Sequence, residues 1–226
     1  MYALATVLFT LLAALPASAQ IAPTEAELRA YSGLHAAAAR GDIAEIEKRI
    51  AAAENREAID DRRRTPLHVA AFQKQHEAAR ALLRLGADPN KLEIDRYDII
   101  TIAAVANDVP MLRIALAGGG NPKAVTSRYD GTALIAAAHL GHAEVVRMLI
   151  AAKAPLDHVN NLQWTALIES IVLGDGGSNH TETLRALVDA GADVNIPDGS
   201  GATPLKLARS RGYREMVAIL EKSGAK

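Results

Sequence analysis

A short motif recurs along this chain at an almost constant spacing. Each copy begins with a Leu or Ile that is followed by small and apolar residues, and a polar residue stands two positions before it. These polar residues are Ser32, Thr65, Asp98, Thr132, Thr165 and Thr203. Their separations are 33, 33, 34, 33 and 38 residues. A period held over six copies predicts an array of stacked units, each of which buries its apolar face against its neighbours.

Each repeated unit has the features of two short helices. Half of the residues are hydrophobic but only 4% are aromatic, and the many Ala and Leu residues favour helices over strands. The Thr that opens most copies suits a helix start, and Pro66 and Pro204 follow it at a first-turn position. A second apolar segment follows in each unit, such as Glu144–Ile150. In other copies a Gly ends this segment, as Gly86 and Gly191 do. Each unit is therefore predicted to be a turn followed by two antiparallel helices.

These segments resemble the ankyrin repeat. Thr65–Ala70 and Thr203–Leu205 match its helix-opening signature, Gly141–Val146 matches its second helix, and Gly191–Asn195 matches its ending. The resemblance covers about residues 25–226. It implies an all-α solenoid of about six stacked helix-turn-helix units with projecting β-turn fingers. The units are expected near residues 25–59, 60–92, 93–126, 127–159, 160–197 and 198–226.

The repeats depart from the family pattern at the fingers and at the ends. The family usually has Gly two residues before the Thr position, and only the last copy keeps it, as Gly201. Larger residues stand there in four other copies, which leaves the geometry of those fingers open: Arg63, Arg96, Asp130 and Gln163. Thr24 and Glu27 have the spacing of a capping box, which predicts an N-terminal capping repeat. Glu221–Lys222 is expected to belong to the opposite cap.

The first 19 residues have the features of an export signal. They carry no charged side chain, and their apolar run from Ala3 to Leu15 is shorter than the roughly 20 residues that span a bilayer. Pro16 and the small residues Ala17–Ala19 then form a cleavage motif. We therefore expect a signal peptide at 1–19, cleavage after Ala19 and a periplasmic or secreted repeat domain at 20–226. An uncleaved anchor and an ordinary terminal helix are the alternatives, because no Lys or Arg precedes the apolar run.

Composition and motifs argue against catalysis. The chain has no Cys, which removes disulfides, Cys-ligated zinc and thiol chemistry. Its 25 basic and 26 acidic residues do not favour nucleic acid or an anionic membrane. No nucleophile elbow, zinc-helix motif or phosphate loop is present, and the acidic residues of Asp60–Asp61 suit turns. We expect no cofactor, no metal, no nucleic acid and no membrane insertion after signal cleavage.

One repeat carries an insertion. Gly174–Asn179 accounts for the longest spacing, and we expect it to form a loop in the turn between two helices. A tolerated insertion is the simplest interpretation. A loop that contacts a partner and a calcium site made of oxygen ligands are the alternatives.

Candidate contact residues gather on the predicted fingers. Tyr97 and Trp164 directly precede the N-cap position, and Tyr129 lies three residues before it. Phe72 and His139 lie near the ends of first helices, where the resemblance implies a concave binding face. Tyr, Trp and Arg are enriched in interface hot spots. The candidate set is Arg62, Arg64, Phe72, Tyr97, Arg128, Tyr129, His139 and Trp164. Alternatively, some aromatic residues pack between fingers and brace the turns that lack Gly.

These observations together favour a binding function. We expect a monomeric, non-catalytic protein-interaction module in the bacterial envelope, which binds a protein partner through the finger turns and the concave face. A secreted effector that binds a foreign protein is the alternative with the same chemistry. An enzyme with an unrecognised site in the groove is the opposing class, for which the sequence supplies no pair of nucleophile and base.

The export signal makes a direct prediction about the mature protein. Cleavage after Ala19 would leave Gln20 as the first residue, so the mass of protein recovered from the envelope fraction should match residues 20–226. Recovery of soluble protein with an intact Met1 would contradict the assignment.

Overall fold

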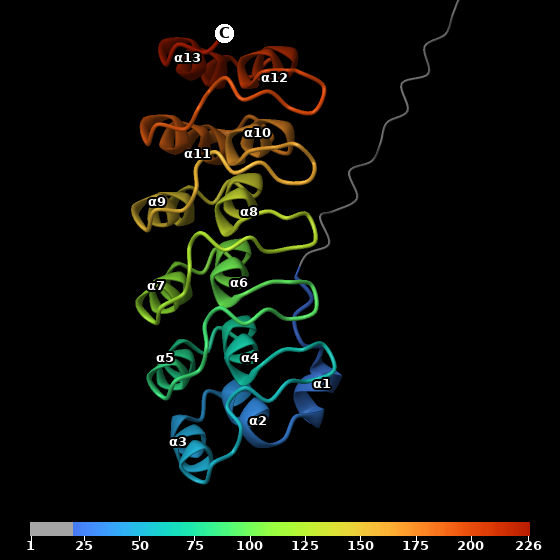
Figure 1. The fold of residues 1–226 in the computed structure, drawn as a ribbon, viewed down its shortest axis with the longest axis vertical. Coiled ribbons are helices and arrows are strands. Elements are labelled where there is room, and N and C mark those ends of the chain that lie inside the picture. Colours follow the sequence, from blue (N-terminus) through green and yellow to red (C-terminus); the bar gives the residue numbers. More distant parts are fainter. Residues whose placement is uncertain (1–19) are drawn as a thin grey trace, which may run out of the picture.

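In a computed structural model, the chain is described over residues 20–226, so the predicted signal peptide and its cleavage site lie outside the described residues. This part of the chain forms one elongated stack of paired helices (Figure 1). No helix in it is long and apolar enough to cross a membrane. The resemblance to ankyrin repeats predicted this architecture, and the structure confirms it.

Six helix pairs and one additional helix make up the described region. The pairs are α2 (Gly33–Arg40) and α3 (Ile43–Ala51), α4 (Pro66–Phe72) and α5 (His76–Arg84), α6 (Ile99–Val105) and α7 (Val109–Ala117), α8 (Ala133–His139) and α9 (Ala143–Ala151), α10 (Ala166–Val172) and α11 (Ser178–Asp189), and α12 (Pro204–Ser210) and α13 (Arg214–Lys222). The additional helix is α1 (Glu25–Ala30), which precedes the first pair.

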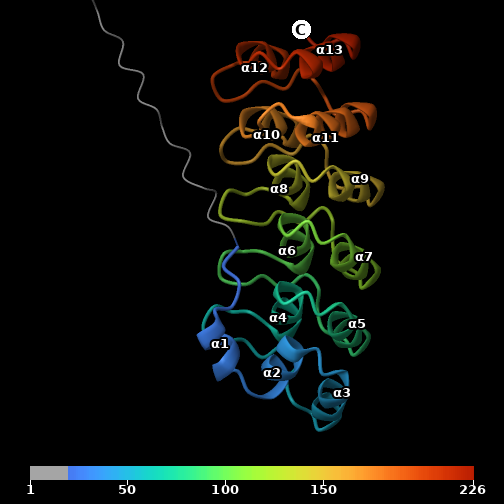
Figure 2. The ribbon, with the colours of Figure 1, turned by 180° about the vertical axis from the view of Figure 1, so that it is seen from behind.

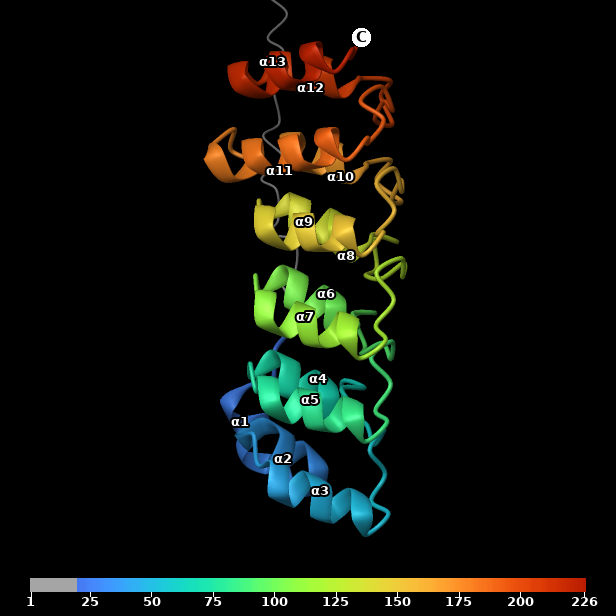
Figure 3. The ribbon, with the colours of Figure 1, turned by 90° about the vertical axis from the view of Figure 1, so that its left-hand side faces the viewer.

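The helices form two parallel rows. The first helices of the pairs stand above one another, and the second helices form a row on one side of them (Figures 1 and 2). The loops that join successive pairs project as fingers along one edge of the stack, which Figure 3 shows from the side. We call the side of the first helices that faces away from the second helices the inner face. Helix α1 lies on this side of α2 (Figures 1 and 2).

The repeated polar residues start the first helices as the sequence predicts. The hydroxyl of Thr65 accepts a hydrogen bond from the backbone N–H of His68, and Asp98 caps α6 in the same way through Thr101. Thr132, Thr165 and Thr203 repeat this arrangement, whereas Ser32 makes no side-chain cap bond. Each such cap satisfies a backbone donor that the first turn leaves free.

Small residues allow the first helices to approach one another closely. A pair of Ala residues occupies the fifth and sixth positions after the N-cap in the first four repeats, as in Ala37–Ala38 and Ala137–Ala138, and every member is at most 2% exposed. A Leu or Ile three positions earlier, such as Leu134, is also buried. The contiguous core runs from Leu34 to Leu220. The packing thus depends on contacts between successive repeats.

Hydrogen bonds also connect each repeat to the next. The Nε2 of His35 donates to the carbonyl of Arg64 at 2.8 Å, and the Nε2 of His68 donates to the carbonyl of Lys91 at 3.0 Å. On the other side of the stack, His142 bonds the carbonyl of Ala104 at 2.9 Å. These histidines therefore have a structural role between neighbouring repeats.

The inserted segment is only partly a loop, which corrects the expectation for Gly174–Asn179. Helix α11 begins at Ser178 and has 12 residues, whereas the other second helices have 9. The carboxylate of Asp175 accepts hydrogen bonds from the N–H of Gly177 at 2.8 Å and from the Nδ1 of His180 at 2.9 Å. These bonds hold the start of the longer helix, so part of the insertion adds a helical turn.

Removal of a core side chain should test the repeat register. Leu134 is fully buried, and a truncation of this kind typically costs about 2–5 kcal/mol of the free energy of unfolding. Leu134→Ala should therefore lower the urea midpoint far more than Ser178→Ala, which changes an exposed residue in the insertion. Equal and small effects would show that the register is wrong.

His68 makes stability depend on pH. Burial is the main cause that lowers the pKa of this imidazole to about 4, and its Nδ1 accepts a hydrogen bond from the N–H of Thr65 at 3.1 Å. The folded protein therefore keeps His68 neutral, whereas the unfolded chain protonates it near pH 6.5. Stability from this residue is complete above pH 6.5 and is lost as the pH falls toward 4.

The linked loss should be measurable by urea denaturation. Between pH 7 and pH 5, we expect His68 to account for a decrease of about 2 kcal/mol in the free energy of unfolding. The variant His68→Gln should be less stable than the unchanged protein at pH 7. Its free energy of unfolding should fall by about 2 kcal/mol less between pH 7 and pH 5, because Gln does not titrate. His158→Gln, which changes a histidine at the surface, serves as the control. An unchanged pH slope in His68→Gln would refute the assignment.

Candidate binding surface

The five fingers share one hydrogen-bonded turn. In the first of them, one carboxylate oxygen of Asp60 accepts from the N–H of Arg62 at 2.9 Å and from that of Arg64 at 2.8 Å. The same pair of bonds, to the second and fourth following residues, is made by Glu93, Ser127, Asn160 and Asp198. A polar side chain at this position therefore builds every finger.

This anchor explains how four fingers dispense with Gly. Arg63 has a φ of 60° and Gln163 a φ of 62°, both in the left-handed region, and Gly201 takes the same region at 81°. Arg96 and Asp130 behave likewise. Left-handed backbone costs a residue with a side chain roughly 1–2 kcal/mol. The two anchor bonds on either side of that residue offset this cost, so the family turn is retained.

Neighbouring fingers are connected at their tips. The N–H of Ile94 donates to the carbonyl of Arg62 at 2.9 Å, and the N–H of Asn161 donates to the carbonyl of Tyr129 at 3.0 Å. Asp95 forms ion pairs with Arg62, at 3.0 Å, and with Arg128. Two of the predicted contact residues, Arg62 and Arg128, therefore hold the fingers together. The Arg128 side chain remains largely exposed.

Arg64 is not a surface residue, which corrects the prediction. Its side chain is 0% exposed and lies between the carboxylates of Asp60, at 2.7 Å, and Glu27. Burial disfavours its charge, but the hydrogen bonds that Arg64 donates to both carboxylates outweigh this effect and raise the pKa of Arg64. Arg64 directly precedes the N-cap Thr65, and its side chain lies on the inner face, where it meets Glu27 of helix α1. Arg64 therefore belongs to an internal ion network.

The predicted aromatic residues divide into two groups. Phe72 and Tyr97 are half-buried and pack against the core, which agrees with the alternative that some aromatic residues brace the fold. Tyr129 is 38% exposed on the fourth repeat's finger. Trp164 is partly exposed and lies outside the set of side chains that pack against the core. Tyr129 and Trp164 thus remain available for a partner.

His139 is linked to the finger that carries Trp164. Its Nδ1 lies 3.3 Å from a carboxylate oxygen of the buried Glu169, whose other oxygen accepts from the amide of Asn160 at 2.9 Å. Asn160 in turn accepts a hydrogen bond from the N–H of Trp164 at 3.0 Å. This chain of contacts joins α8, α10 and the intervening finger. It connects His139 to the turn that carries Trp164 through the side chains of Glu169 and Asn160.

The fingertips also carry apolar residues that are not among the predicted contact residues. Ile94 is 49% exposed and Leu162 is 43% exposed, and they lie on the fingers to either side of Tyr129. We call Ile94, Tyr129 and Leu162 the fingertip row. Exposed apolar residues mark interaction surfaces when they are grouped. Their positions three and four residues before the N-cap were the signal that could have identified them.

Comparisons with known proteins agree with the geometry. The family model for ankyrin repeats, built on three copies, matches residues 6–93 and 100–198. The chain belongs to the ankyrin-repeat family, whose members are protein–protein interaction modules. It is 33% identical to the ankyrin repeat protein YahD of Escherichia coli over 84% of this chain and 94% of that protein.

Solved structures show the same fold. An ankyrin repeat domain from Acinetobacter baumannii superposes with a TM-score of 0.82 at 43% identity, over 85% of this chain and 98% of that one. A chain in the complex of the endopeptidase Bd0816 with the immunity protein Bd3460, from Bdellovibrio bacteriovorus, gives a TM-score of 0.71 at 20% identity. This match covers 85% of this chain and 98% of that one, and it concerns the fold alone.

Proposed function

We propose that this protein is a non-catalytic binding module of the bacterial envelope, which holds a protein partner through the fingers of the third to fifth repeats. The observation that carries the proposal is the exposed fingertip row together with Trp164, on fingers that backbone hydrogen bonds hold at fixed spacing. Rigid display lowers the entropy cost of binding. The envelope location is supported by the export signal predicted at residues 1–19.

The two free aromatic residues carry different parts of this surface. Tyr129 belongs to the fingertip row, whereas Trp164 directly precedes the N-cap of α10, and its N–H donates to Asn160, which also bonds Glu169. Large aromatic side chains bury much area and lose little conformational entropy on binding. The ion pairs of Arg62 and Arg128 with Asp95 hold the surrounding surface in place. We therefore propose Tyr129 and Trp164 as the principal contacts.

Substitution of these aromatic residues tests the proposal. The variants Tyr129→Ala and Trp164→Ala should each weaken capture of the partner from an envelope extract, by about 2 kcal/mol or more if the residue is a hot spot. Their melting temperatures should change little, because neither side chain contributes to the core.

A matched control separates binding from folding. Ile43 is 36% exposed, close to the value for Tyr129, but it lies at the start of α3, away from the fingers. Ile43→Ala should leave both capture and melting temperature unchanged. If Trp164→Ala and Tyr129→Ala capture the partner as well as the unchanged protein does, the fingers are not the binding surface. If capture falls only in proportion to unfolding, the aromatic residues brace the fold instead.

A further inference from the structure

The segment before the first repeat lies across the inner face of the stack. We call residues 20–30, which comprise an extended segment and helix α1, the N-terminal strap. In Figures 1 and 2 the strap runs beside the fingers from α1 to the level of α6. The side-chain amide of Gln20 donates to the carbonyl of Thr101 in α6 at 2.8 Å. The strap thus reaches from the first repeat to the third.

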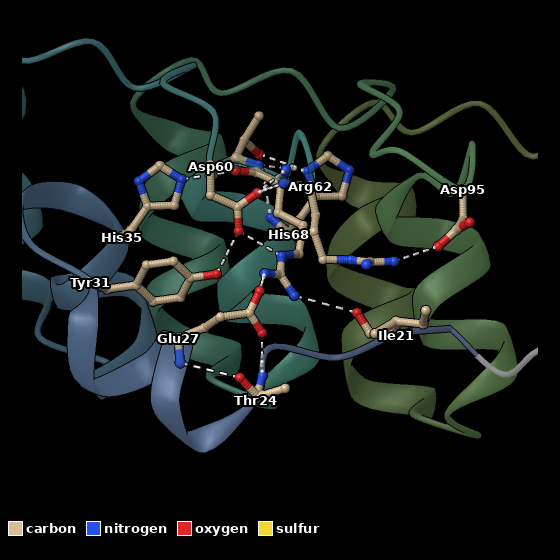
Figure 4. Close-up of polar contacts among 11 residues, drawn as sticks. Ile21, Thr24, Glu27, Tyr31, His35, Asp60, Arg62, His68 and Asp95 are labelled. Atoms are coloured by element: carbon tan, nitrogen blue, oxygen red, sulfur yellow. Dashed lines mark hydrogen bonds and ion pairs between the residues drawn. The ribbon is translucent and has the colours of Figure 1, made fainter.

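An ion network fixes the strap to the first finger (Figure 4). Arg64 pairs with Glu27 of the strap and with Asp60 of the finger, and it donates to the carbonyl of Ile21 at 3.4 Å. The hydroxyl of Tyr31 donates to Asp60 at 2.6 Å. The N–H of Thr24 and the Arg64 guanidinium both stabilise the Glu27 carboxylate, which lowers the pKa of Glu27.

Two apolar residues of the inner face are buried where the strap runs. Val69 and Ile102 occupy the same position in α4 and α6, and they are 0% and 1% exposed. Val69 is buried although it lies outside the contiguous core. The equivalent residues of α8 and α12, Ala136 and Leu207, are partly exposed. In α10 the same position holds the buried Glu169. The strap therefore lies over an apolar strip of the inner face, and the later repeats differ from it in their own residues.

The strap itself is held by few contacts. Helix α1 has no buried residue, and Pro23 is the one buried residue between Gln20 and Ala30. The contacts that fix it are polar: the pair Glu27–Arg64, the bond from Arg64 to Ile21, and the bond from Gln20 to Thr101. A segment attached in this way can leave without breaking the packing of any repeat.

We propose that the inner face of the first three repeats is a binding site for an extended, acidic segment of a partner protein, and that the strap occupies this site until the partner displaces it. The partner's carboxylate takes the place of Glu27 on Arg64, its backbone carbonyl takes the place of Ile21, and its apolar side chains cover Val69 and Ile102. This site deepens the proposed function, on which it rests for the class of partner.

The strap competes with a partner because it is tethered beside the site that the partner would occupy. A tethered segment acts at an effective concentration of the order of millimolar, so the strap masks the site from a free peptide. Loss of the charge on Glu27 removes a charge-assisted hydrogen bond, which weakens the strap about tenfold or more. Asp60 still neutralises Arg64 in that case, so the fold should be kept.

A labelled copy of the strap serves as the probe. A fluorescent peptide with the sequence of residues 20–30 is titrated with the full protein and with its variant Glu27→Gln, and binding is followed by anisotropy. We expect the peptide to bind Glu27→Gln at least tenfold more tightly than the unchanged protein. A peptide that itself carries Gln in place of Glu27 should lose this binding.

The neighbouring Glu25 supplies a matched control. It lies in the same helix and pairs only with Arg29 at the surface, so Glu25→Gln changes the same charge without touching Arg64. This variant should bind the peptide as weakly as the unchanged protein. Hydrogen exchange of the amides of residues 20–30 should accelerate in Glu27→Gln and not in Glu25→Gln. If Glu27→Gln proves unstable by melting temperature, Gln20→Ala replaces it, with the same expected direction.

The outcomes separate a displaceable strap from a structural cap. Failure of the peptide to bind Glu27→Gln, or equal binding to Glu27→Gln and Glu25→Gln, would overturn the proposal. Trp164→Ala should leave peptide binding unchanged, since Trp164 lies beyond the strap. Loss of partner capture in Trp164→Ala therefore tests the fingers, whereas peptide binding tests the strap, and each can fail without the other.

Discussion

Contact between one repeat and the next is the interaction on which the rest of this structure depends. A single pair of short helices cannot bury its apolar side chains, and its first helix has only one or two turns of core-facing residues. The Ala pairs, such as Ala37–Ala38 and Ala137–Ala138, let neighbouring first helices approach until each covers the other. Bonds such as that from His35 to the Arg64 carbonyl then fix the register between repeats. The stack is stable as a sum of these neighbour contacts.

The spacing of the fingers is set by the spacing of the stacked repeats. Because successive first helices lie one repeat apart, the loops between pairs come close enough to exchange backbone hydrogen bonds, as Ile94 and Arg62 do. The anchor side chains, of which Asp60 and Asn160 are examples, then fix each turn even where the left-handed residue is not Gly. A rigid edge of this kind presents Tyr129 and Leu162 at a reduced ordering cost.

The inner face is divided into two parts with different chemistry. Over the first three repeats it is apolar, carries the buried cation of Arg64 and is covered by the strap. Over the later repeats the strap does not cover it, and the buried carboxylate of Glu169 pairs there with His139. A partner that contacts both parts must therefore satisfy a cation at one end and an acid–histidine pair at the other. This asymmetry arises from the N-terminal segment and from residues that differ between repeats at one position, such as Val69 in α4 and Glu169 in α10.

The sequence alone determined the repeat architecture, and tertiary structure decided which finger residues are available. Period, capping residues and helix-ending glycines act within one unit, so the six helix pairs and the Thr24–Glu27 capping box could be predicted. Arg64 and Trp164 occupy the same position in their repeats, yet one is fully buried and the other is partly exposed. The difference comes from Glu27, which meets Arg64 across 37 residues of sequence. The repeat period cannot predict a contact made by a segment outside the repeats. Only the tertiary structure therefore shows where the strap lies.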